Sequence, residues 1–97
     1  MTADELASSA LAGGNPPDAL SPEARALWLA KAGQWEAAHH VAQDIDTPMG
    51  SWIHALLHLI EGDTGNAGYW FARAGRRPVG RGEIDAEWHR IAAEVLA

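Results

Sequence analysis

One strongly apolar segment, residues 52–61, limits the folds open to this chain of 97 residues more than any other feature. On a helix, its apolar side chains would wrap roughly 200° of the circumference, far more than the single stripe of a surface helix. Other elements must therefore cover it on most sides, and we predict that it lies in the core. Its one polar stripe, about 60° wide, carries His54, His58 and Glu61. Polar groups buried in this way need a partner, a ligand or water.

Start and stop signals along the rest of the chain predict an all-α protein. Serine or threonine followed by proline marks a helix start, glycine marks a helix end, and no segment alternates as a strand would. Five tryptophans fall one to a helix, as expected of large core residues in an alanine-rich bundle: Trp28, Trp35, Trp52, Trp70 and Trp88. Helices are predicted over residues 3–12, 22–32, 34–45, 48–61, 64–74 and 83–96.

The chain divides into two parts near its first prolines. Residues 1–20 are predicted to form a short helix and a proline-rich tether, because Pro16 and Pro17 bar helix there. The first helix has few apolar residues, so we expect it to be loosely attached. Residues 21–97 are predicted to be a helical-repeat domain.

Charge and composition exclude several classes of function. The formal net charge of −6 argues against nucleic-acid binding through the overall field. No run of about 18 apolar residues and no export signal is present, so we expect no membrane partner and a cytoplasmic location. Basic residues gather at Arg73, Arg76, Arg77 and Arg81. This cluster is interpreted either as a solvated loop after a helix or as a recognition site for a carboxylate or phosphate.

Two helix pairs are related by a shift of 29 residues, which aligns Gly33 with Gly62 and Ala38 with Ala67. A glycine that ends one helix, followed by a small residue in the next, lets antiparallel helices pack closely. The repeated pattern covers about residues 22–78.

This pattern, with Trp35 after the first turn and Pro48 and Pro78 after the second helices, resembles tetratricopeptide and Sel1-like repeats. The resemblance implies antiparallel helical hairpins stacked as a short tetratricopeptide-like repeat with a capping C-terminal helix. It also implies a small interaction module whose concave surface binds a protein or peptide, with no catalytic residues. Separately, His54 to Gly75 resembles a motif of small bacterial proteins of unknown function, H-x3-H-x2-EGD-x2-NA-x-YW.

The turn at residues 62–65 folds the polar stripe of residues 54–61 towards a second polar stripe, formed by Asn66, Trp70 and Arg73. Three interpretations are open for them: a structural polar seam, a binding groove for a protein or peptide, and a metal site. In each, we expect Glu61 near Asn66, His58 near Tyr69 or Trp70, and His54 towards Arg73. The groove residues are His54, His58, Glu61, Asn66, Tyr69, Trp70 and Arg73.

The metal interpretation uses His54 and His58, one helical turn apart, with Glu61 or Asp63 as a third ligand for a divalent ion such as zinc. The groove interpretation needs no cofactor. His39 and His40 are expected to be a surface pair whose side chains point roughly 100° apart and do not chelate together. No nucleophile or phosphate-binding loop has the spacing of a catalytic motif, so we do not expect an enzyme. A homodimer through the last helix is a further interpretation.

Overall fold

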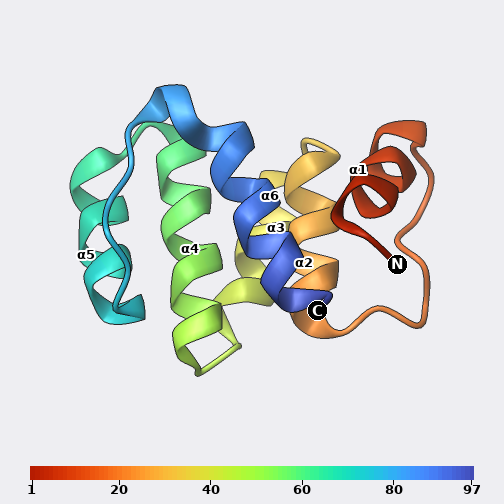
Figure 1. Ribbon diagram of the computed structural model, residues 1–97, viewed down its shortest axis with the longest axis horizontal. Helices are drawn as coiled ribbons and strands as arrows, with labels where there is room; N and C mark the ends of the chain where they lie inside the picture. The colour runs from red at the N-terminus through yellow and green to blue at the C-terminus, as the bar shows by residue number, and fades with distance from the viewer.

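The capping residues of the sequence set the helix boundaries. Thr2 and Glu5 form a capping box at the first helix, and Ser21, Thr47 and Asp63 each accept a hydrogen bond from a first-turn amide. The computed structural model describes residues 1–97 and confirms the all-α prediction, with boundaries within two residues of those expected (Figure 1). The elements are α1 (Ala3–Ala12), α2 (Pro22–Lys31), α3 (Trp35–Gln43), α4 (Pro48–Glu61), α5 (Thr64–Ala74), the 3₁₀ turn η1 (Arg81–Glu83) and α6 (Ile84–Val95).

A glycine in the left-handed conformation closes the α4–α5 hairpin. Gly62 has φ 92° and ψ 8°, and the amide of Asp63 donates to the carbonyl of His58. Glycine adopts this conformation without a side-chain clash, so the chain reverses within about two residues. As a result, α5 runs back alongside α4 (Figure 1).

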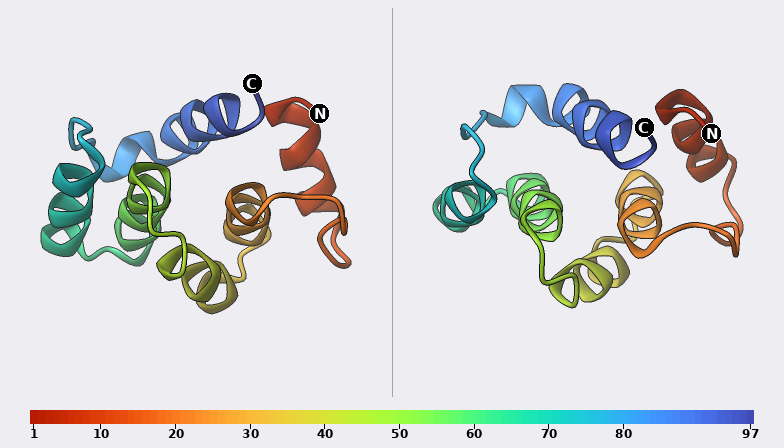
Figure 2. Two further views of the ribbon diagram at one scale, coloured as in Figure 1. Left: turned by 90° about the horizontal axis from the view of Figure 1, so that it is seen from below. Right: turned by 60° about the horizontal axis from the view of Figure 1, so that its bottom comes forward.

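Helix α4 is the centre of the fold. It packs against α3 on one side and α5 on another, while α2 pairs with α3. Helix α6 turns back and lies across α2 and α4, so its apolar face is covered within the chain (Figure 2). None of the helices combines the length and the apolar character needed to cross a bilayer.

Three of the five tryptophans are fully enclosed in the core. Trp28, Trp52 and Trp88 are 0%, 3% and 2% exposed. Each buried indole N–H also needs an acceptor, because an unpaired donor in the core costs free energy. The acceptors are Ser9 Oγ, Glu87 Oε2 and the Leu27 carbonyl, respectively.

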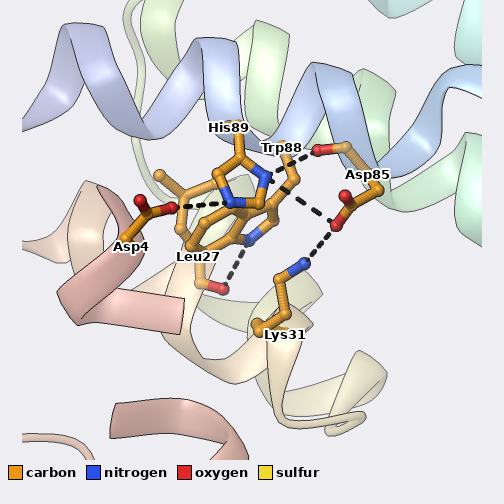
Figure 3. Close-up of polar contacts among 6 residues, drawn as sticks. All are labelled: Asp4, Leu27, Lys31, Asp85, Trp88 and His89. Atoms are coloured by element: carbon orange, nitrogen blue, oxygen red, sulfur yellow. Dashed lines mark hydrogen bonds and ion pairs between the residues drawn. The ribbon is translucent and has the colours of Figure 1, made fainter. Parts of the chain in front are cut away.

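Helix α1 is part of the core, so the expectation of a loosely attached first helix is wrong. Leu6 is fully buried against the other helices. Polar contacts join α1, α2 and α6 at this edge, as Figure 3 shows. Asp4 Oδ1 lies 3.4 Å from His89 Nε2, and Lys31 Nζ donates to Asp85 Oδ1 at 2.8 Å. Buried apolar contacts hold α1 in place, since exposed ion pairs contribute at most about 1 kcal/mol.

Candidate functional site

Three imidazoles from two helices meet on the α3 side of α4. His54 and His58 on α4 are only 6% and 7% exposed, and His39 on α3 is half-buried. The ring centroids are 4.6 Å apart for His39 and His54, 4.9 Å for His54 and His58, and 5.3 Å for His39 and His58. One nitrogen of each ring lies within 4.8 Å of one nitrogen of both others. We call His39, His54 and His58 the histidine cluster.

Two indoles form the walls of the histidine cluster. Trp35 stacks on His39 with centroids 4.9 Å apart, and Trp70 stacks on His54 at 3.9 Å and an interplanar angle of 13°. The Trp35 indole is itself held, because its Nε1–H donates to the carbonyl of Leu57 at 2.6 Å. Packing of this kind restricts the rotation of the imidazoles and keeps them in one arrangement.

The hydrogen bonds of the histidine cluster all belong to His58. Its Nδ1 lies 3.1 Å from Glu61 Oε1, and its Nε2 lies 3.4 Å from the side-chain nitrogen of Asn66. The amide nitrogen of Asn66 can only donate, so it faces the lone pair of His58 Nε2, and Nδ1 faces the carboxylate. The rings of His39 and His54 make no hydrogen bond within the chain, which leaves their lone pairs available to a ligand.

Burial keeps two of the imidazoles neutral. Loss of solvation, together with weaker repulsion from the neighbouring His39 and His58, lowers the pKa of His54 to about 4. Burial also lowers the pKa of His39, again with repulsion from His58. A neutral imidazole is the form that binds a metal ion. His39 and His54 therefore present ligand-competent nitrogens at neutral pH.

The depressed pKa of His54 predicts a specific dependence of stability on pH. Between about pH 4 and the ordinary value of 6.5, the unfolded chain binds a proton at His54 that the folded chain does not. Stability should therefore rise with pH through this range and level off above it. We expect the His54→Gln variant to lose less stability than the wild type between pH 7 and pH 5 in urea denaturation, while His40→Gln should follow the wild type. Equal losses in all three proteins would contradict the assignment.

The register of the α4–α5 hairpin differs from the expected one by about one helical turn. His58 hydrogen bonds with Asn66, and each lies four residues from Gly62. His54 stacks on Trp70, and each lies eight residues from Gly62. The hairpin is thus centred on the left-handed glycine. The centre predicted from the sequence lies later, within residues 62–65, so the predicted partner of each histidine is too far along α5.

Two predicted groove residues, Tyr69 and Arg73, lie at the surface beside Trp70. The Arg73 guanidinium does not pair with His54, because its Nη1 donates to the Tyr69 hydroxyl at 3.2 Å. It also lies 5.2 Å from the centroid of the Trp70 ring. Tyr69 is 55% exposed on the outer side of α5. The structure therefore groups His54, His58, Asn66 and Trp70 from the predicted set, with Tyr69 and Arg73 at the surface beside them.

Glu61 takes a different position from the one predicted for a third metal ligand. Its carboxylate is exposed and lies 3.1 Å from His58 Nδ1, where it orients the ring. A carboxylate often has this supporting contact with a metal-binding histidine. Glu61 also groups with His58 and Asp63 at the rim, but Asp63 Oδ1 already caps α5 by accepting from the Asn66 amide.

His39 is the residue that the sequence analysis missed. The expectation of a surface pair holds for His40, which is exposed, but the His39 ring turns inward against α4. The chain does carry a signal for this contact. His39 and His54 lie seven and eight residues from Asp46, in the turn between α3 and α4, so an antiparallel hairpin brings them to the same level.

Comparisons with known proteins add no homologue to this description. The chain matches no protein-family model, and no curated protein or solved structure is significantly similar to it. The likeness to tetratricopeptide and Sel1-like repeats therefore stays a prediction. The geometry of the histidine cluster is the main guide to function.

Proposed function

We propose that the protein binds a divalent transition-metal ion, such as zinc, through His39, His54 and His58. The observation that carries the proposal is the convergence of three imidazoles, one nitrogen of each within 4.8 Å of the others. Around a tetrahedral zinc ion, ligand nitrogens lie roughly 3.3 Å apart. The imidazoles would have to rotate against the stacked indoles of Trp35 and Trp70 to close this difference.

The chemistry of the ligands favours a borderline transition metal. The chain has no cysteine, so thiolate ligands are absent, and imidazole nitrogens suit Zn²⁺, Cu²⁺ or Ni²⁺ better than Mg²⁺ or Ca²⁺. Glu61 supports the site by orienting His58. Three protein ligands leave a fourth tetrahedral position for water or for another molecule.

Metal content and melting temperature together test this proposal. Protein purified without a histidine tag should contain bound metal by elemental analysis, or should bind Zn²⁺ after treatment with a chelator. Zinc at about 100 times its Kd should stabilise the fold by about 2.7 kcal/mol, which raises Tm by roughly 10–20 °C for a domain of this size. Excess chelator should reverse the shift. Absence of bound metal together with an unchanged Tm would remove the metal site.

A second proposed function is that of a small interaction module for a protein or peptide. The exposed Tyr69 favours it, because large apolar side chains on a surface often mark contact sites and Arg73 beside it adds a charged donor. His54 is buried and would contribute only by supporting Trp70.

Capture from a lysate tests the interaction surface. Tyr69→Ser should lower partner recovery, and the fold should be unaffected because the side chain is exposed. Arg25→Gln on α2 serves as a control. Equal recovery with all three proteins would remove Tyr69 from the proposed surface.

A further inference from the structure

A pocket with a volume of about 460 Å³ lies between α4, α6 and the segment after α5. It shares no residue with the histidine cluster. Three of its residues are arginines, and two of these belong to the basic cluster noted in the sequence. We call it the arginine pocket, and it is lined by Trp52, Arg76, Arg77, Val79, Glu87, Arg90, Ala93 and Glu94.

A buried carboxylate forms one wall of the arginine pocket. Glu87 is 3% exposed, and both of its oxygens have donors. Oε2 accepts from Trp52 Nε1 at 2.8 Å, and Oε1 accepts from Arg90 Nε at 2.7 Å. A carboxylate in the interior is tolerated only when it is paired in this way. The wall therefore has a fixed arrangement, and Arg90 is already neutralised.

The opposite wall leaves one positive charge without a partner. The Arg76 guanidinium lies 3.8 Å from the centroid of the Trp52 ring, and its Nη2 is 2.9 Å from both carboxylate oxygens of Glu94. Arg77 is exposed and forms no ion pair within the chain. Among the lining residues, three arginines and two glutamates leave one surplus positive charge, and Glu83 lies outside the lining, 3.8 Å from Arg90 Nη2.

We propose that the arginine pocket binds a small organic monoanion, with one carboxylate on an apolar body. The single unpaired cation, Arg77, matches one negative charge, and its planar fork suits a carboxylate. Glu87 and Glu94 would repel a dianion such as phosphate. The remaining lining is apolar and accommodates hydrocarbon, and the volume is within the range of about 300–1,000 Å³ that small-molecule sites occupy.

Hexanoate is a suitable probe, with hexanamide and inorganic phosphate as controls. At constant ionic strength, nuclear magnetic resonance of the ¹⁵N-labelled protein should show saturable shifts of the Trp52 indole N–H and the Ala93 amide on adding hexanoate. Hexanamide keeps the hydrocarbon and lacks the charge, so it should cause no saturable shift. Phosphate has the charge without the hydrocarbon and should bind at least ten times more weakly than hexanoate.

Three variants assign the binding to the pocket charges. Arg77→Gln should weaken hexanoate binding roughly 1.5- to 5-fold, the range expected for loss of one exposed charge contact. Glu94→Gln should tighten it, because Arg76 is then free to face the ligand. Arg25→Gln, at a partly buried arginine of α2 outside the pocket, should leave the affinity unchanged.

Several results would overturn the proposal. Equal shifts with hexanoate and hexanamide would show that the pocket binds hydrocarbon without recognising the carboxylate. Phosphate binding as tight as hexanoate binding would contradict the proposed preference for an organic monoanion. Equal affinity in Arg77→Gln and Arg25→Gln would show non-specific attraction. None of these results depends on whether the histidine cluster binds a metal ion, because the two sites share no residue.

Discussion

Replacement of His39 by asparagine should lower zinc affinity at least about 100-fold, because a site with three ligands then retains only two. The His39 ring contacts both other members of the histidine cluster. Its neighbour His40 provides a matched control, since it is a histidine on the same helix but is exposed. We expect His40→Asn to bind zinc as the wild type does. Competition with a chromogenic chelator measures all three affinities.

Folding must be checked separately from metal binding in this comparison. His39 is half-buried and stacks on Trp35, so His39→Asn also removes a packing contact. Far-ultraviolet circular dichroism and Tm without metal show whether the variant is folded before its affinity is compared. A folded His39→Asn protein with the affinity of wild type would exclude His39 as a ligand. Equal losses in His39→Asn and His40→Asn would indicate non-specific binding.

Replacement of Gly50 by alanine should destabilise the protein by about 2–3 kcal/mol, through crowding at the start of α4. The added Cβ would overlap the carbonyl oxygen of Ile45 and would lie 2.8 Å from both Cβ and Cγ2 of that residue. One of these neighbours is backbone, which does not move out of the way as a flexible side chain can. Against a total stability of about 5–15 kcal/mol, the loss is large.

Gly68→Ala is the control for the Gly50 substitution, and the opposite sign is expected. Gly68 lies within α5, and a Cβ there would meet no atom within 4 Å. Alanine is favoured over glycine in a helix interior by about 0.5–1 kcal/mol, so this variant should be more stable than wild type. Urea midpoints should move in opposite directions for the two variants. Movement in the same direction would contradict the crowding at Gly50.

The helices could be predicted from the sequence because their signals are local. Thr47 with Pro48 starts α4 and Gly62 ends it, and each signal acts within one turn of the residue that carries it. The burial of α4 also followed from its sequence, because apolar residues on most sides of one helix must be covered by others. These features need no knowledge of how the helices cross.

The two sites were only partly predicted, because they depend on contacts between distant segments. His54 and His58 were identified from their spacing on one helix, whereas His39 joins them only through the register of the α3–α4 hairpin. The clustering of the arginines could be recognised in the sequence. Their placement against Trp52 and Glu87 depends on the path of α6, which no local signal in the sequence specifies.

The course of α6 also determines how the molecule can change in evolution or design. In an open array of repeats, each unit touches only its neighbours, so units can be added at the end and the end frays first. Here the last helix packs against α1, α2 and α4, which joins both halves of the chain in one core. A further hairpin inserted after α5 would have to lengthen the connection to α6 or displace that helix. The fold is therefore a closed unit rather than one segment of an extendable rod.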